Sequence, residues 1–307
     1  MAFNGYITMF SGTVDWLGNF IGVLKRAQVS YKRLEKVFKL DKEKINVTKL
    51  VKTNDKWKGK IEINDLTYHY PGKFNHVLKN ITINIQPGQK LGIIGTIGSG
   101  KTTLMNLLLK LYEVDNNKIY IDGKDINDIP IEEIRNNICY ITQDNFLFST
   151  TLKENINLFR DKYKDEDIIK STKRAMIYDE ITSMPNRIET IIGERGVDLS
   201  GGQKQRVVIS RAFLNNSRIV IFDDTFSALD NKTEQQLLEN IKQTMKDKTC
   251  IIISNRISDV KISDHIIVLE DGQIIEKGTH DELVNQHGRY YEFYTQQSSK
   301  TEEDLLA

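Results

Sequence analysis

The sequence has few of the residues that stabilise disulfide-linked, zinc-bound or disordered proteins. It contains only 2 cysteines and 4 prolines in 307 residues. Cys139 and Cys250 each lie inside an apolar run, and no metal-type spacing relates them. We therefore expect neither a disulfide scaffold nor a zinc site, and we expect a reducing compartment. With 28% charged residues and so little proline, the composition also argues against disorder.

An excess of charge of one sign is also missing. The chain has 43 Lys+Arg against 42 Asp+Glu, which gives a net charge of +1. A dedicated nucleic-acid-binding protein needs a strongly basic surface to meet the phosphate backbone. We therefore expect no nucleic acid among the partners of this protein.

The first 24 residues differ in composition from the rest. Residues 1–24 carry one charge, Asp15, and their length matches the roughly 20 apolar residues that cross a bilayer core. Basic residues follow from Lys25 and Arg26 onward, which places the next segment on the cytoplasmic side by the positive-inside tendency. The pattern predicts the C-terminal part of a transmembrane helix at 1–24, then a helical extension and linker at 25–58. An amphipathic helix packed on a soluble domain is the alternative.

From residue 59 onward the pattern predicts an α/β domain. The continuous apolar runs at 138–142, 219–223 and 250–254 are typical of strands buried on both faces of a parallel sheet. Partial alternation from residue 61 and the Asp122-Gly123 turn predict antiparallel strands beside it. Between about 143 and 209 the strand signal disappears and helical periods dominate, so we expect an inserted helical subdomain there.

The first chemical motif is a phosphate-binding loop at residues 95–102. The glycines of this stretch let the backbone curl so that successive N–H groups point at phosphate oxygens, and the following helix adds its partial positive charge. Lys101 is expected to reach the β- and γ-phosphates and Thr102 to bind Mg²⁺. The motif G-x-x-x-x-G-K-[ST] is matched by Gly95, Thr96, Ile97, Gly98, Ser99, Gly100, Lys101 and Thr102.

A phosphate-binding loop alone does not distinguish kinases, GTPases and transport ATPases. The run from Ile219 to Asp223 consists of four apolar residues followed by a carboxylate. This places Asp223 at the edge of the sheet where a Mg²⁺ ligand is needed. This pattern is weak by itself, because many such runs are plain core strands.

The stretch Leu199-Ser200-Gly201-Gly202-Gln203, before a predicted helix, distinguishes between these classes of protein. A serine and two glycines at a helix N-terminus make a second anion-binding cap. With this pentapeptide the sequence resembles the ATP-binding cassette (ABC) family, in order, over about residues 59–290. The resemblance implies a P-loop cassette at 59–298 with a tail at 299–307, a mixed sheet core, an antiparallel β subdomain and an inserted helical subdomain. It also implies ATP and Mg²⁺ as cofactors.

In this family two cassettes enclose two ATP molecules, each held by one chain's phosphate-binding loop and the other chain's signature pentapeptide. The resemblance places Tyr70 against adenine, and it gives Gln143 contacts to Mg²⁺ and to the attacking water. It assigns residues 227–230 to the loop that crosses to the partner. The expected metal ligands are Thr102, Gln143 and Asp223. The expected ATP contacts are Tyr70, the eight loop residues, Thr103, Gln143, Ser200, Gly201, Gly202 and Gln203.

Several segments resemble the exporter branch of the family. Residues 193–196, just before the signature, look like the exporter segment that meets intracellular loops, and residues 276–283 are also of exporter type. The apolar N-terminus then resembles the end of an exporter's sixth transmembrane helix. We therefore expect a membrane location with the ATPase on the cytoplasmic side, a transmembrane domain, and a second half-transporter as partner. The five transmembrane helices that would precede it are not in this sequence. The sequence would then be a piece of a longer protein or a shortened chain.

Two residues depart from the family pattern. Asp224 stands where active members have Glu, and its side chain is one methylene, about 1.5 Å, shorter. Members of the family have Ser-His-Arg at the end of the strand predicted at 250–254, and here Asn255 stands in place of the histidine. Asparagine cannot carry charge near neutral pH. With Lys101 and Gln143 these residues form the expected catalytic set, so the pattern predicts the slow half of a heterodimeric exporter. A slow homodimeric exporter and a truncated ATP-binding regulatory subunit are the alternatives.

Overall fold

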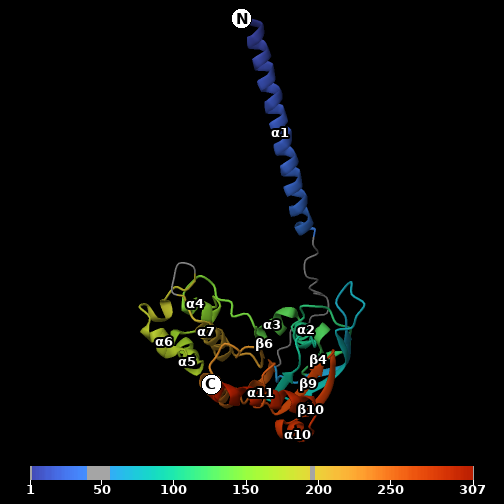
Figure 1. The fold of residues 1–307 in the computed structure, drawn as a ribbon, viewed down its shortest axis with the longest axis vertical. Helices are drawn as coiled ribbons and strands as arrows, with labels where there is room; N and C mark the ends of the chain where they lie inside the picture. Colours follow the sequence, from blue (N-terminus) through green and yellow to red (C-terminus); the bar gives the residue numbers. More distant parts are fainter. Residues whose placement is uncertain (1, 40–55, 194–197, 307) are drawn as a thin grey trace. The chain divides into compact units, whose positions relative to one another are not determined.

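The structure is a computed structural model that describes residues 2–39, 56–193 and 198–306, without the side chains beyond residue 299. It divides into two units, Met1–Thr48 and Lys49–Ala307. Figure 1 shows both units, and each is described by itself.

The described part of the first unit forms helix α1 (Ala2–Phe38), whose side chains are nearly all exposed. Trp16 and Phe20 stack on each other one turn apart, with ring centroids 5.5 Å apart. No helix in the described part of the chain is both long and apolar enough to cross a membrane. The helix expected at residues 1–24 is present from Ala2 onward, and its place at the end of a transmembrane helix stays a prediction. Asp15 and polar residues such as Asn4 and Asn19 lower its hydropathy.

The second unit, the cassette, is built on a six-stranded sheet in the order β10-β9-β3-β8-β7-β6. Neighbouring strands are parallel from β9 to β6, and only β10 pairs in the antiparallel sense. The apolar runs predicted the parallel strands, and the mixed sheet agrees with what the resemblance to the ABC family implied. The strands are β3 (Lys90–Ile94), β6 (Ile138–Ile141), β7 (Ile219–Asp223), β8 (Thr249–Ser254), β9 (His265–Glu270) and β10 (Gln273–Gly278).

The central strands are buried on both faces. Along β8, Ile251 and Ile253 belong to one hydrophobic core while Cys250 and Ile252 belong to another. Because successive side chains of a strand point to opposite faces, the sheet separates these two cores. A continuous apolar run is the sequence that such a strand requires.

A smaller antiparallel sheet, in the order β2-β1-β4-β5, accompanies the first. Ile61 of β1 pairs with Ile85 of β2 on one side and with Ile121 of β4 on the other. The antiparallel subdomain expected from the alternating pattern is therefore present. Its strands are β1 (Ile61–Tyr68), β2 (Leu78–Ile85), β4 (Ile119–Ile121) and β5 (Lys124–Asp125).

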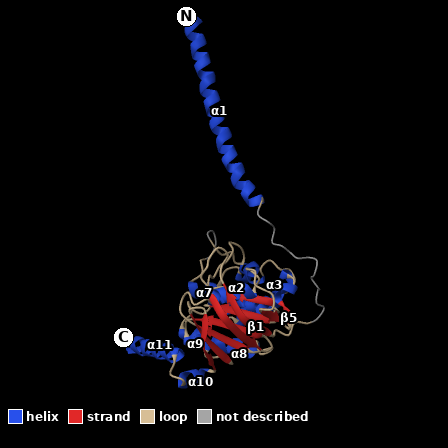
Figure 2. Cartoon of the chain, turned by 90° about the vertical axis from the view of Figure 1, so that its right-hand side faces the viewer, coloured by secondary structure: helices blue, strands red, loops and turns tan. Residues whose placement is uncertain are grey.

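Helices cover the sheets, and among the described residues four α-helices lie between β6 and β7 in the sequence. Three of these, α4, α5 and α6, gather at one side of the cassette, whereas α2 lies on the other side with the strands (Figure 1). Figure 2 shows the strands together with helices around them. The helices of the cassette are α2 (Lys101–Leu108), α3 (Ile131–Asn137), α4 (Leu152–Asn157), α5 (Asp165–Arg174), α6 (Tyr178–Ser183), α7 (Gly201–Leu214), α8 (Asn231–Thr244), α9 (Ile257–Val260), α10 (His280–Asn285) and α11 (Arg289–Leu306), with short 3₁₀ turns at Ile126–Asp128 and Arg187–Glu189.

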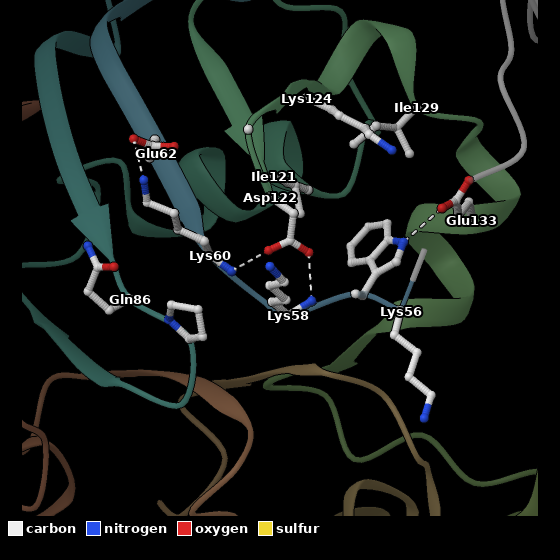
Figure 3. A pocket seen from close by; sticks show the side chains of 13 residues that line it. Lys56, Lys58, Lys60, Glu62, Gln86, Ile121, Asp122, Lys124, Ile129 and Glu133 are labelled. Atoms are coloured by element: carbon white, nitrogen blue, oxygen red, sulfur yellow. Dashed lines mark hydrogen bonds and ion pairs between the residues drawn. The ribbon is translucent and has the colours of Figure 1, made fainter. Parts of the chain in front are cut away.

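The start of the cassette is fastened by side chains from the β4–β5 turn and α3 (Figure 3). The Asp122 carboxylate accepts hydrogen bonds from the backbone N–H groups of residues 58–60 at 2.8–3.2 Å. The indole of Trp57 donates to Oε1 of Glu133 at 2.8 Å. A cavity of about 820 Å³ is lined by Trp57, Lys58, Lys60, Asp122, Glu133 and Pro87, among others. Pro87 precedes β3, and the phosphate-binding loop follows β3. The cavity therefore lies at the opposite end of this strand from the loop.

Candidate nucleotide-binding site

The phosphate-binding loop needs its glycines for two reasons. Gly98 and Gly100 have φ of +86° and +104°, a backbone region that costs glycine little and other residues more. A Cβ on Gly95 would lie 2.1 Å from the carbonyl oxygen of Leu269, so no side chain fits there. The loop connects β3 to α2, and Gly100 is the N-cap of that helix. A curled backbone followed by a helix N-terminus suits an anionic phosphate group.

The ammonium group of Lys101 lies inside this loop. Its Nζ donates to the carbonyl oxygens of Gly95 and Thr96 at 2.8 and 3.0 Å, and to Oδ1 of Asn255 at 3.1 Å. Only 7% of the residue is exposed. Burial lowers the pKa of Lys101, and the negative charges of Asp224 and Asp223 act in the opposite direction. The lysine is thus held beside the loop by uncharged oxygens that a phosphate could replace.

Asp223 ends β7 and is held by a hydroxyl group. Tyr140 of β6 donates to Oδ2 of Asp223 at 2.6 Å, and the side chain of Thr102 is near enough to lower the pKa of this carboxyl group. Burial is the main cause that raises the pKa of Asp223, with a smaller contribution from Asp224, while Tyr140, Lys101 and Thr102 lower it. Two of the three expected metal ligands, Thr102 and Asp223, therefore lie together.

Asp224 and Asn255 lie at the same edge of the sheet. Asp224 has φ of +45°, which aspartate tolerates better than most residues, and its N–H donates to the carbonyl oxygen of Ile253 at 2.9 Å. The backbone N–H of Asn255 donates to Oδ1 of Asp224 at 3.3 Å. Because parallel strands end at one edge, the residues that follow β3, β7 and β8 converge there.

Tyr70 is tied to the helix after the loop. Its hydroxyl and that of Thr103 are 2.9 Å apart and hydrogen bonded. Its ring meets those of Tyr68 and Tyr112 edge-to-face, with centroids 5.5 and 5.1 Å away. The aromatic residue expected against adenine thus lies next to α2, with one hydrogen bond to fix its position.

Gln143 is exposed two residues beyond the end of β6. Because Ile141 pairs with Phe222, Gln143 leaves the sheet beside Asp223. A hydroxyl, an amide oxygen and a carboxylate are oxygen ligands of the kind Mg²⁺ prefers, so Thr102, Gln143 and Asp223 fit this ion chemically. No three His, Cys, Asp or Glu side chains converge as a metal site within the ranges that the structure describes.

The signature residues cap α7 rather than joining the loop. The Ser200 hydroxyl accepts from the N–H of Gln203 at 3.3 Å, and Gln203 Oε1 accepts from the N–H of Ser200 at 2.9 Å. A Cβ on Gly202 would lie 3.1 Å from the carbonyl oxygen of Ala228, and one on Gly201 would lie 3.8 Å from the Cβ of Ala228. The pentapeptide therefore packs on the 227–230 loop. Most of the exporter-type segment 193–196 lies outside the described residues.

Two groups at the site were not anticipated from the sequence. The first is the Tyr140 hydroxyl, which was hidden within an apolar strand pattern. The second is a buried acidic pair next to Asn255. Glu234 forms an ion pair with Arg256 at 2.6 Å, and Asp259 accepts from the Ser254 hydroxyl at 2.5 Å. Burial raises the pKa of Asp259 to about 7, and the charge of Glu234 contributes. The available signal was Asp259 between Ile257 and Val260, close after the buried strand β8.

Proteins of similar sequence are ABC transporters, which agrees with the geometry of this site. The family model of ABC transporters matches residues 78–227. An uncharacterised ABC transporter ATP-binding protein of Bacillus subtilis (strain 168), YfiB, is 37% identical over 97% of this chain and 51% of its own length. A putative multidrug export ATP-binding/permease protein of Staphylococcus aureus (strain NCTC 8325 / PS 47) is 41% identical over 78% of this chain and 42% of its own length.

A solved structure gives the same result. A bacterial Atm1-family ABC exporter with ATP bound superposes with a TM-score of 0.76 at 32% identity, covering 82% of this chain and 44% of that one. The chain spans about half the length of the curated relatives it matches. The chain therefore belongs to the ABC transporter family and carries its ATP-binding cassette.

Proposed function

We propose that this cassette powers an exporter as the slow half of a pair, binding ATP firmly at its own loop while turning it over slowly. The observation that carries the proposal is the set of contacts around Lys101. Its Nζ meets an uncharged Asn255, and Asn255 in turn contacts Asp224. The parts that bind phosphate are intact, while both residues expected to act on water and the γ-phosphate are altered.

The binding roles follow from position. Residues 95–102 and Thr103 hold the phosphates, and Tyr70 stacks on adenine. Thr102, Gln143 and Asp223 hold Mg²⁺, which when bound neutralises charge on the phosphate oxygens. The cap at residues 200–203 completes the ATP site of a second cassette, since it lies on a different subdomain from the loop.

Slow turnover follows from the two altered side chains. A carboxylate that is about 1.5 Å short cannot orient a water as a glutamate would, and a misplacement of about 1 Å can cost on the order of 10²-fold in rate. Asn255 can donate or accept hydrogen bonds but adds no positive charge near the γ-phosphate. A site of this kind favours prolonged ATP occupancy over rapid hydrolysis.

Two of the similar proteins support a proposal for location and partners. The Staphylococcus aureus relative is named for multidrug export and as an ATP-binding/permease protein, and the structural neighbour is an exporter. We therefore place this cassette on the cytoplasmic side of a membrane, joined to a transmembrane domain. The intact signature and altered catalytic residues favour a non-identical second half-transporter as partner.

The test is the ATPase rate of the purified chain with Asp224→Glu and Asn255→His combined. We expect slow hydrolysis by the wild type and an increase of about 10- to 100-fold in the double variant. Asp271→Glu is a matched control, since Asp271 has a φ of +47° against +45° at Asp224 and lies in the β9–β10 turn. A fast wild type that the double change does not accelerate would disprove the slow-site proposal. ATP binding without hydrolysis in either protein would instead favour the regulatory subunit.

A further inference from the structure

The hydroxyl of Tyr140 is directed at the carboxylate that ends the neighbouring strand. Tyr140 pairs with Ile221 in the parallel β6–β7 ladder, and Asp223 lies two residues further along β7 on the same face. The Tyr140 hydroxyl thus reaches Oδ2 of Asp223 diagonally, at 2.6 Å. The strand that carries this tyrosine continues directly to Gln143.

This hydrogen bond has a fixed direction. The phenol carries the proton and an ionised carboxylate can only accept, so Tyr140 is the donor and Asp223 the acceptor. Only 4% of Asp223 is exposed, so water cannot easily replace this donor. A buried carboxylate without its donors is costly, which makes the phenol a strong constraint on the orientation of Asp223.

We propose that Tyr140 is a positioning residue for the metal site, whose hydroxyl holds Asp223 in the orientation that binds Mg²⁺ with ATP. The inference rests on the proposed role of Asp223 as a metal ligand. Hydrogen-bond donors to a ligating carboxylate typically contribute 10- to 100-fold to metal affinity.

The test is the affinity of the full chain for Mn²⁺, used as a paramagnetic substitute for Mg²⁺, with a non-hydrolysable ATP analogue present. The Tyr140→Phe variant keeps the ring and removes only the hydroxyl. We expect its Mn²⁺ dissociation constant, measured by electron paramagnetic resonance, to rise at least about 10-fold. Binding of the analogue in EDTA should stay within about twofold of wild type, because the phosphate-binding loop is untouched.

Tyr120→Phe is the matched control. Tyr120 is also a strand tyrosine, and its hydroxyl donates to Oδ1 of Asn117 at 2.9 Å, in the exposed turn before β4. It should leave Mn²⁺ affinity unchanged. Unchanged Mn²⁺ affinity in Tyr140→Phe would overturn the inference. An equal loss of analogue binding in EDTA, or a melting temperature lowered by more than about 10 °C, would assign the hydroxyl to folding instead and would also overturn it.

The inference and the proposed function can fail separately. If the wild type binds the analogue but shows no Mn²⁺ site, the role given to Asp223 is wrong and both fail. If the wild type binds Mn²⁺ tightly and Tyr140→Phe weakens it, the inference holds even when wild-type hydrolysis proves fast.

Discussion

The backbone N–H of Asn255 donates a hydrogen bond to Oδ1 of Asp224 at 3.3 Å, so the two residues that depart from the ABC pattern are in contact. The amide oxygen of Asn255 accepts from Lys101 Nζ on its other side. Changes at residues that share a contact are generally not independent. The altered chemistry of this site is therefore one unit rather than two separate substitutions.

The first prediction is that Asp224→Glu and Asn255→His act non-additively on the ATPase rate. Residues in contact typically show interaction energies of about 0.5–3 kcal/mol. We expect each single change to raise kcat only slightly. A glutamate at 224 would still lack the histidine at 255, and a histidine at 255 would still lack the glutamate at 224. The measurement is kcat for the wild type, both single variants and the double variant. Additivity of the logarithms of the rates to within about 0.3 kcal/mol would show that the two positions act independently.

A second prediction concerns Lys101. Lys101→Met removes an ammonium that lies among loop carbonyl oxygens, and a hydrogen bond to a charged group is worth about 1.5–3 kcal/mol. We expect ATP affinity, measured by calorimetry, to fall about 10- to 100-fold. Lys110→Met is the control, because Lys110 is also partly buried and donates to the carbonyl oxygen of Ile129, beyond the end of α2. Equal losses in both variants would show that general destabilisation, not phosphate contact, is being measured.

Much of this fold could be predicted because its strands have unambiguous patterns. The run at 219–223 was expected as a buried strand and matches β7 residue for residue. The helix expected after the phosphate-binding loop is present and ends at Leu108. Lys110 takes a positive φ of +52°, which ends the helix although the apolar period continues to Leu111. Periodicity cannot detect such a backbone change.

The site was less predictable where single atoms decide its geometry. The loop motif placed Lys101 next to phosphate-binding backbone, but nothing in the sequence indicated that Asn255 would accept from its Nζ. That contact depends on how β3 and β8 pair, since Ile94 lies opposite Ser254. Register between distant segments is set by the whole sheet, so it is not readable from either segment alone.

A third prediction is that Asp259 makes stability depend on pH. Its pKa in the folded protein is raised to about 7, chiefly by burial. An acid whose folded pKa exceeds its unfolded pKa is stabilising below the unfolded value, and this contribution is lost as pH rises to the folded pKa. We therefore expect the melting temperature to fall between about pH 4 and pH 7 from this group.

Asp259→Asn tests this assignment because an amide keeps the size of the side chain and does not titrate. Its facing charged groups are Glu234 and Arg256, and Ser254 supplies the hydrogen bond. The difference in melting temperature between variant and wild type should grow from pH 4 to pH 7 in favour of Asn. A difference that stays constant over this range would mean that Asp259 does not titrate there.

The last prediction concerns the start of the cassette. Asp122 accepts hydrogen bonds from three backbone N–H groups in residues 58–60 (Figure 3). Asp122→Ala leaves these donors without a partner and also places alanine at a φ of +51°, a region it tolerates poorly. We expect a loss of about 2–3 kcal/mol in the free energy of unfolding, measured with urea.

Asp122→Asn separates the two causes of this loss. Asparagine tolerates a positive φ and keeps one acceptor oxygen, so we expect it to cost about 1 kcal/mol. The exposed Asp161→Ala should change stability by less than about 0.5 kcal/mol. If Asp122→Ala costs no more than Asp161→Ala, the hydrogen bonds at residues 58–60 contribute nothing to the fold. The start of the cassette would then be held by its other contacts, such as the Trp57–Glu133 hydrogen bond and the pairing of Ile61 with Ile85 and Ile121.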